Sequence, residues 1–200
     1  QRQMCIRDRE HRYVTISRCM KLISKKLILD NMKYCQPNIR MGEDLTLLLP
    51  CLLDCEHLVV MDHKAYYHYL YVTESMAHQY DKGLYENNRK LRKIINHILE
   101  EKCCNTSEIT MPDYAWMLDQ ADREYIFLLL LVLKNEARGN PAGYKKNIRE
   151  ICNAPEVKEL VQKTVVEIHE KSNLLLYLVL LHPNAFMIRV LRLAMILYYR

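Results

Sequence analysis

The chain has 200 residues, enough for one domain or for a small domain with an appendage. Hydrophobic residues make up 50% and charged residues 26%, a balance that excludes a disordered chain and is typical of a globular one. The formal net charge of +5 fits an anionic membrane surface or an anionic substrate and does not require nucleic acid. With only four glycines, the sequence argues against a glycine-rich phosphate loop and favours helices.

The N-terminal segment is polar and basic over residues 1–9 and has no helical or strand period. This string resembles a translated sequencing adapter, so we treat it as a non-native leader and leave it out of the fold. Residues 13–16 are rich in β-branched side chains and predict a strand. Ser24 is a suitable N-cap for a helix that ends near residue 32, and the segment 34–40 predicts a loop.

An apolar helix is predicted at residues 44–53, and Gly42 precedes its acidic start. Glycine can adopt backbone angles that are closed to other residues, so it suits a sharp entry turn. Glu43 and Asp44 would then lie in the first turn, where free N–H groups and the helix dipole favour negative charge. One interpretation is an ordinary helix start. The other is that one carboxylate faces a cleft and takes a proton from a substrate hydroxyl.

Two short segments after this helix predict strands, a buried one at residues 57–61 and a second at residues 64–71. Strand alternation places His63 and His68 on opposite faces, so we interpret them as structural or surface residues rather than metal ligands. A run of tyrosines in the second strand could stack on a sugar or simply pack in the protein. These tyrosines are Tyr66, Tyr67, Tyr69 and Tyr71.

From residue 81 to residue 200 the apolar pattern is helical throughout. Helices are predicted at residues 83–102, 110–138, 142–152 and 155–171. The longest has a strong start, with Thr110 as N-cap and Asp113 three residues later, and it ends at Gly139. Its apolar run at residues 128–133 must be buried in a bundle or pressed on a membrane.

The C-terminal tail, residues 174–200, is apolar and is interrupted at residues 182–184. Neither half reaches the roughly 20 residues that are needed to span a bilayer. Arg189 and Arg192 among apolar residues suit an interfacial helix in peripheral contact with a membrane. A last core helix with solvated arginines explains the same pattern.

The eight cysteines show neither a Cys-x-x-Cys pair nor a Cys-His set with zinc spacing. We therefore expect reduced, mostly buried thiols in a cytosolic protein, and no metal site in this chain.

Three motifs follow one another within residues 21–80. Lys-Leu and Ser-Lys-Lys-Leu occur at residues 21–27, Met-Gly-Glu-Asp-Leu occurs at residues 41–45, and Tyr-His-Tyr followed by Ser-Met occurs at residues 67–76. Their order and spacing resemble those of the acceptor-side half of a family 2 glycosyltransferase with the GT-A fold. The second motif is similar to that family's Gly-Glu-Asp motif, which carries the catalytic base.

The resemblance implies a helix-dominated α/β fragment. Residues 10–80 would be the truncated acceptor-side part of the GT-A core, with short helices and a few strands, and residues 81–200 an all-helical appendage. It also implies an inverting enzyme that moves a sugar from a nucleotide-activated donor to an acceptor hydroxyl in polysaccharide or glycoconjugate synthesis. Asp44 would be the catalytic base, and Glu43 would position Asp44 or bind the acceptor. The implied acceptor-binding residues are Arg40, Gly42, Tyr67, Tyr69 and Ser75.

The chain also departs from that family's pattern. It has no Asp-x-Asp, the motif that holds a divalent metal under the donor diphosphate, and Leu70 stands where the family often has a basic residue. We therefore expect a fragment that lacks the nucleotide-binding half and is inactive alone, with Mg²⁺ or Mn²⁺ bound by the intact enzyme and not by this chain.

The partners implied for the intact enzyme are a nucleotide-sugar donor and a glycan or lipid-linked acceptor, with no nucleic acid. The implied location is the cytoplasm, at the inner face of the membrane. The alternative is a non-enzymatic helical interaction or membrane-surface module, in which Glu43 and Asp44 merely begin a helix.

Overall fold

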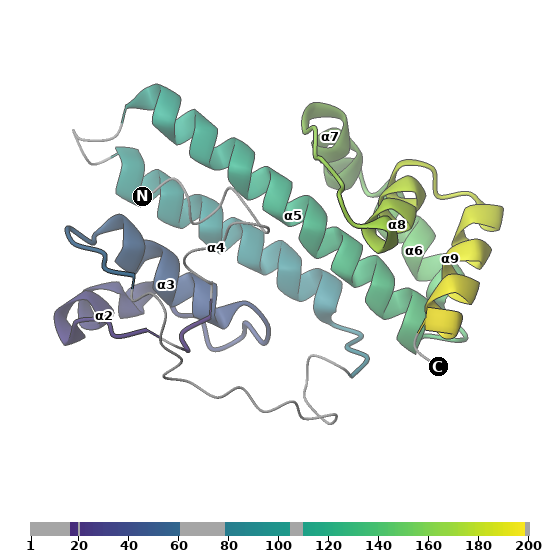
Figure 1. The fold of residues 1–200 in the computed structure, drawn as a ribbon, viewed down its shortest axis with the longest axis horizontal. Coiled ribbons are helices and arrows are strands. Elements are labelled where there is room, and N and C mark those ends of the chain that lie inside the picture. The colour runs from purple at the N-terminus through teal and green to yellow at the C-terminus, as the bar shows by residue number, and fades with distance from the viewer. Residues whose placement is uncertain (1–16, 20, 61–78, 105–109, 199–200) are drawn as a thin grey trace. The chain divides into compact units, whose positions relative to one another are not determined.

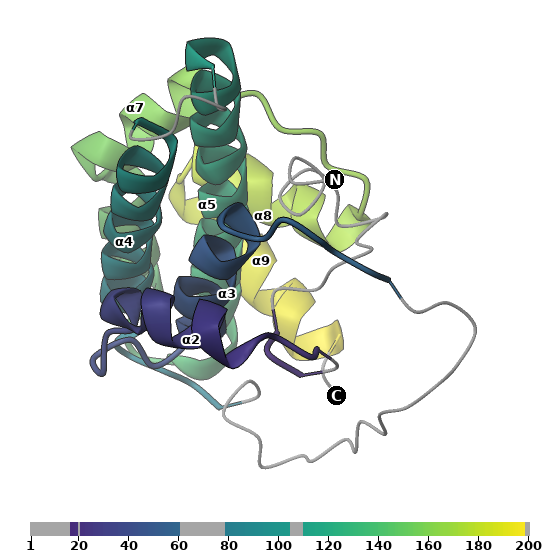
Figure 2. The same cartoon turned by 90° about the vertical axis from the view of Figure 1, so that its left-hand side faces the viewer.

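The computed structural model describes residues 17–19, 21–60, 79–104 and 110–198. These residues form helices joined by turns and irregular segments, as Figures 1 and 2 show. The chain divides into two compact units, and each unit combines two separate stretches of sequence. The first unit comprises Gln1–Tyr71 and Asn87–Ala121, and the second comprises Val72–Glu86 and Asp122–Arg200.

The first unit is built from short helices and from parts of the two longest ones. Its elements are α2 (Lys25–Asn31), the 3-10 helix η1 (Met32–Tyr34), α3 (Glu43–Leu53), most of α4 (Leu84–Cys104) and the start of α5 (Met111–Gly139). Ser24 is the N-cap of α2, because its hydroxyl oxygen accepts a 3.2 Å hydrogen bond from the amide of Leu27. Pro50 lies inside α3 without ending it.

A hydrophobic cluster joins these elements into one core. Its buried members come from η1, α3, α4 and α5 and are Tyr34, Leu49, Ile98, Leu99, Cys103, Met117 and Ala121. The apolar positions of α4 repeat at helical spacing, so one face of that helix enters the core while the opposite face remains polar.

The second unit holds the rest of α5 and the remaining helices. These are α6 (Tyr144–Asn153), α7 (Pro155–Lys163), α8 (Lys171–Leu181) and α9 (Ala185–Tyr198). Within the apolar run of α5, Leu129 and Leu133 are fully buried, whereas Leu131 is 39% exposed. Most of the apolar side chains at residues 128–133 are therefore covered by the protein itself. Among the described helices, none combines the length and the apolar character that a membrane crossing requires.

The expectation of an α/β fold with GT-A strands is wrong, because none of the described residues lies in a strand. The apolar segment 57–60 is irregular, and Val59 is 82% exposed. An apolar run indicates burial, but a strand also needs a neighbouring strand to pair its backbone groups, which the run itself does not specify. The other two expected strands, at residues 13–16 and 64–71, lie outside the described residues. The helical character expected after residue 81 is confirmed in the part of the chain that the structure describes. The helix expected at residues 155–171 is shorter, because α7 ends at Lys163 and residues 164–170 are not helical.

Candidate functional site

The acidic pair of the Gly-Glu-Asp motif opens α3. Gly42 is the N-cap and has a φ of 89°, in the left-handed region that favours glycine. A Cβ at this position would lie 2.5 Å from Cδ2 of Leu91 on α4, so a side chain there would force Leu91 to move. Glu43 and Asp44 follow directly in the first turn of the helix. The expected glycine-dependent entry turn is therefore present.

Arg18 is the partner of both carboxylates. Its backbone amide donates a 3.1 Å hydrogen bond to Oδ2 of Asp44, and its Nε donates to Oδ1 of the same carboxylate. Its Nη2 lies 3.7 Å from Oε1 of Glu43. The hydrogen bond to Asp44 raises the pKa of the Arg18 guanidinium above its ordinary value, although partial burial opposes the shift. Arg18 therefore fixes the orientation of the Asp44 carboxylate at the start of α3.

Asn87 on α4 fixes the backbone immediately before the motif. Its Oδ1 accepts hydrogen bonds from the amides of Arg40 at 2.8 Å and Met41 at 3.4 Å, and its Nδ2 donates to the carbonyl of Met41 at 2.8 Å. The side chain is only 6% exposed, so these contacts form away from bulk water, where a missing partner would be costly. Asn87 and Leu91 together determine where the chain turns into α3.

The motifs in the sequence do not point to Asn87 or Arg18. A signal for Asn87 exists in the pattern, because it lies three residues after Leu84 and four before Leu91, both on the apolar stripe of α4. A polar residue at such a position needs a buried hydrogen-bond partner. Arg18 carries no comparable signal in the sequence.

The structure describes only part of the predicted acceptor site. Arg40 is exposed, and its backbone is held by Asn87 next to Gly42, Glu43 and Asp44. The remaining predicted acceptor-binding residues, Tyr67, Tyr69 and Ser75, lie outside the described residues. Four of the predicted site residues therefore lie together at the N-terminus of α3. That the two tyrosines and the serine bind the acceptor remains a prediction.

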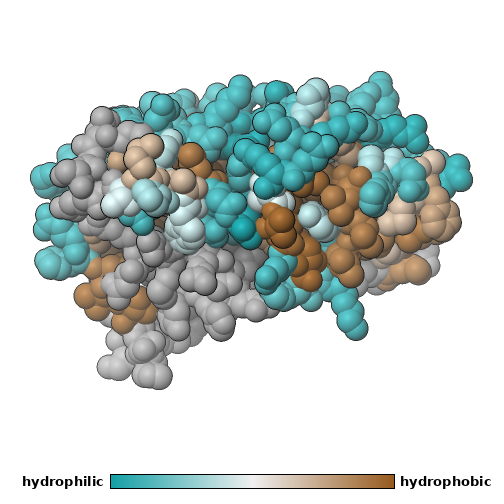
Figure 3. All heavy atoms as spheres, turned by 90° about the horizontal axis from the view of Figure 1, so that it is seen from above, coloured by the Kyte–Doolittle hydropathy of each residue, from teal (hydrophilic) through white to brown (hydrophobic). Residues whose placement is uncertain are grey.

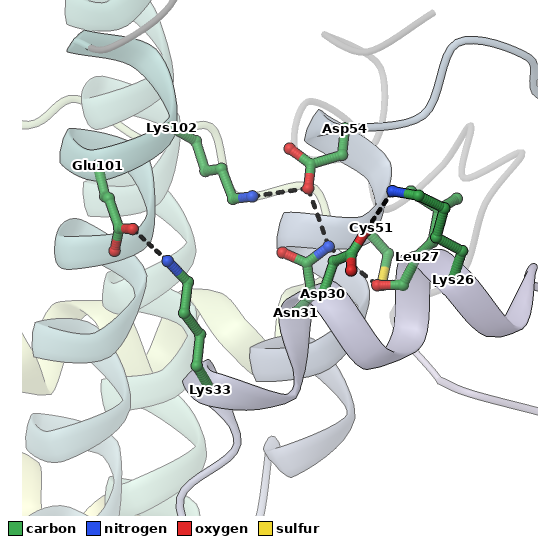
Figure 4. Close-up of polar contacts among 9 residues, drawn as sticks. All are labelled: Lys26, Leu27, Asp30, Asn31, Lys33, Cys51, Asp54, Glu101 and Lys102. Carbon is green, nitrogen blue, oxygen red and sulfur yellow. Dashed lines mark hydrogen bonds and ion pairs between the residues drawn. The ribbon is translucent and has the colours of Figure 1, made fainter.

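A second polar cluster, the polar junction, lies at the other end of α3 and is made of Asn31, Asp54 and Lys102 (Figure 4). Oδ2 of Asp54 accepts hydrogen bonds from Nζ of Lys102 at 2.6 Å and from Nδ2 of Asn31 at 2.9 Å. Asn31 is fully buried and also donates to the carbonyl of Leu27 at 3.0 Å. Nearby, Lys33 pairs with Glu101. These contacts tie α2, α3 and α4 together, which is a structural role.

The polar junction shifts the pKa of Asp54. Burial alone raises the pKa of this carboxyl, but donation from Lys102 and Asn31 and the positive charges of Lys102 and Lys33 outweigh it, so the pKa lies below its ordinary value. Asp54 is therefore an ionised member of this network and is not suited to proton transfer near neutral pH.

The cysteines with described side chains are free thiols, and burial raises the pKa of the Cys152 thiol to about 12. A thiol with this pKa stays protonated near neutral pH and is a poor nucleophile. In residues 17–19, 21–60, 79–104 and 110–198, no group of three or more His, Cys, Asp or Glu side chains could hold a metal ion. Comparison of the chain with protein-family models, with curated proteins and with solved structures gives no match.

Proposed function

We propose that this chain carries the acceptor-side catalytic part of an inverting sugar transferase, in which Asp44 is the general base. The observation that carries the proposal is the position of Asp44 in the first turn of α3, with its carboxylate bound by Arg18 and its side chain 28% exposed. The guanidinium of Arg18 holds this carboxylate in a fixed orientation, and part of its surface stays open to solvent. The resemblance of residues 41–45 to the Gly-Glu-Asp motif supports the same assignment.

The geometry leaves Asp44 able to accept a proton. An ionised carboxylate offers about four lone-pair sites, and the two hydrogen bonds from Arg18 use one site on each oxygen. An acceptor hydroxyl that reaches a free site can pass its proton to Asp44 while its oxygen bonds to the anomeric carbon of the sugar. The bond from that carbon to the nucleoside diphosphate breaks at the opposite face, which gives inversion. Glu43 also faces Arg18 and positions the guanidinium beside Asp44.

The proposal assigns the donor site and its divalent metal to residues outside this chain, because the sequence has no Asp-x-Asp. The partners of the intact enzyme are a nucleotide-sugar donor and a glycan or lipid-linked acceptor. The proposed place of action is the cytoplasmic face of the membrane.

The test is the Asp44→Asn variant in the intact enzyme with its nucleotide-binding half. Turnover should fall by roughly 10²–10⁴, the usual contribution of a general base. Donor affinity should be nearly unchanged, because Asp44 contacts the acceptor and not the nucleotide. Glu43→Gln is the matched control and should lose less turnover if it acts only through Arg18. Wild-type turnover in Asp44→Asn would show that the base is elsewhere.

A second candidate function is a helical interaction module, and the contact with Arg18 favours it. In that case Glu43 and Asp44 serve only to fasten Arg18 to the start of α3. Arg18→Gln would then destabilise the fold as much as Asp44→Asn, by up to about 1 kcal/mol, because both remove the same partly exposed pair. No transferase activity would be found in the intact protein, which separates this candidate from the first.

A further inference from the structure

Helix α9 has two apolar faces, and only one of them is packed. Ile188 and Leu191 are fully buried and Met195 is 5% exposed, so these residues form the packed face. Phe186, Leu193 and Leu197 are 72%, 62% and 70% exposed. At about 100° per residue, these three side chains fall within about 40° of one another, on the side of the helix opposite the packed face. We refer to Phe186, Leu193 and Leu197 as the apolar face of α9.

The two arginines of α9 have different surroundings. Nη1 of Arg192 donates to the carbonyls of Ala137 and Arg138 at the C-terminal end of α5, where cations are favoured. Its guanidinium also lies 5.5 Å from the ring centroid of Tyr144, a cation–π contact. The guanidinium of Arg192 therefore makes its contacts within the second unit. Arg189 is exposed, and at about 100° per residue it lies beside the apolar face of α9.

The preceding helix adds apolar surface of the same kind. Leu174, Leu178 and Leu181 of α8 recur at positions i, i+4 and i+7, and each is between 37% and 45% exposed. Figure 3 shows brown, hydrophobic side chains at the surface on the right of that view, the side on which α8 and α9 lie in Figure 1. Exposed apolar side chains that gather on one element in this way mark an interaction surface.

We infer that the apolar face of α9 docks on an anionic lipid surface, with Arg189 at the level of the lipid phosphates. The charge pattern favours an anionic lipid surface as the partner. Residues 171–200 contain no Asp or Glu, and Arg189 is exposed beside the apolar face. An interfacial helix lies in the plane of the membrane, with apolar side chains among the upper acyl chains and basic side chains at the headgroups. A long arginine side chain suits that boundary, because its stem is apolar and its charged end stays in water. The inference is independent of the role of Asp44.

The experiment is flotation of the full 200-residue chain with vesicles made of phosphatidylcholine and phosphatidylglycerol. The wild-type chain should float with these vesicles. The triple variant Phe186→Ser, Leu193→Ser, Leu197→Ser should partition at least about tenfold more weakly, because it removes apolar area that enters the membrane. The matched control is Leu22→Ser, Met111→Ser, Val165→Ser, which removes three side chains that are 97%, 72% and 74% exposed elsewhere in the chain. This control should float like the wild type.

The charge contribution is tested separately with Arg189→Gln. One basic side chain near an anionic surface is worth about 1 kcal/mol, so partition to the anionic vesicles should fall about fivefold at low salt. Partition to vesicles of phosphatidylcholine alone should be the same for Arg189→Gln and the wild type. Circular dichroism should show unchanged helix content in all variants, because the substituted residues are exposed.

Three results would overturn the inference. The first is flotation of the triple variant with the same affinity as the wild type. The second is an equal loss in the triple variant and its matched control, which would indicate general hydrophobic adhesion. The third is a wild-type chain that does not float but self-associates through the apolar face of α9, as judged by loss of association in the triple variant. That result would assign the face to a second copy of the chain.

Discussion

Gly42 is the residue on which the geometry of the acidic pair depends most. Its φ of 89° is unfavourable for any residue with a Cβ, and a Cβ would lie 2.5 Å from Leu91. Gly42→Ala should therefore lower the free energy of unfolding by about 1–3 kcal/mol, a range that combines backbone strain with displacement of Leu91. Urea denaturation followed by the fluorescence of Trp116 measures this loss in the first unit.

Gly83→Ala is the control for Gly42→Ala. A Cβ at Gly83 would meet only Oδ1 of Asp81, at 3.3 Å, and the backbone there has no positive φ. The control should change stability by less than about 1 kcal/mol, and an alanine can even stabilise a compatible site. Equal stability of Gly42→Ala and the wild type would contradict the left-handed turn before α3.

Asp54 should make the stability of the chain depend on pH in the acidic range. Its pKa in the folded state lies below the ordinary value of 3.8, so the stabilising charge is fully present above that value and is lost as the pH falls through the folded pKa. Asp54→Asn should reduce the free energy of unfolding at pH 7 by about 1–2 kcal/mol, because it removes charge-assisted hydrogen bonds from Lys102 and Asn31.

The dependence of this stability loss on pH shows whether the charge of Asp54 causes it. The difference in stability between the wild type and Asp54→Asn should be constant from about pH 7 to about pH 5 and should shrink below about pH 4. Asp30→Asn is a suitable control, because its partner Lys26 lies one turn away on the same exposed helix surface. A difference that grows as the pH falls would mean that the carboxylate of Asp54 is not stabilised by the polar junction.

Among single residues, the sequence pattern predicted the importance of Gly42, Glu43 and Asp44. It did not predict Arg18 and Asn87, which hold this segment in place. The glycine and the two acids are adjacent, so a local pattern reveals them. Arg18 and Asn87 are 26 and 47 residues away from their partners, and only the packing of the chain brings them together. Side-chain contacts over such distances leave no periodic signal in a single sequence.

At the scale of elements, the start of α5 shows how a local signal specifies a helix end. The hydroxyl oxygen of Thr110 accepts a 3.4 Å hydrogen bond from the amide of Asp113, and Oδ2 of Asp113 accepts a 3.2 Å hydrogen bond from the amide of Thr110. This reciprocal pair is a capping box with aspartate in the acidic position. Thr110→Ala should cost about 1 kcal/mol of stability, which chemical denaturation can measure.

Met111→Ala is the neighbouring control for the cap. Met111 is 72% exposed and is the first residue of α5, so its side chain has no capping role. It should change stability by less than about 0.5 kcal/mol, as is usual for surface positions. If Thr110→Ala and Met111→Ala have the same effect, the cap does not stabilise the helix.

Helices could be predicted from the sequence more reliably than strands. Helices carry their own hydrogen bonds and their own start and stop residues, so the predicted helix 110–138 differs from α5, Met111–Gly139, by one residue at each end. A strand depends on a partner that is elsewhere in the chain. The apolar pattern at residues 57–61 predicted a strand, and its described residues, 57–60, do not form one.

At the scale of the whole molecule, the two compact units combine stretches that are not adjacent in the sequence. Helices α4 and α5 each contribute residues to both units, because the divisions fall after Glu86 and after Ala121, inside those helices. Helical periodicity runs without a break across both positions, and no proline or glycine marks them. Composition and periodicity therefore could not reveal this division.

The 200-residue chain alone should transfer no sugar and bind no nucleotide-sugar. Departure of a nucleoside diphosphate needs its charge to be neutralised by a metal or by a cationic clamp. The sequence has no Asp-x-Asp and too few glycines for a phosphate-cradling loop, with four in all. In the proposed role as a base, Asp44 needs a donor held beside the acceptor, because positioning supplies much of the rate.

Isothermal titration calorimetry with nucleotide-sugars and Mg²⁺ or Mn²⁺ tests donor binding, and product analysis tests transfer. The intact enzyme with a nucleotide-binding half is the positive control. Its Asp44→Asn variant should still bind the donor, so a loss of transfer there can be attributed to the base. Metal-dependent donor binding by the 200-residue chain alone would contradict the prediction. It would place a donor site within residues 1–200.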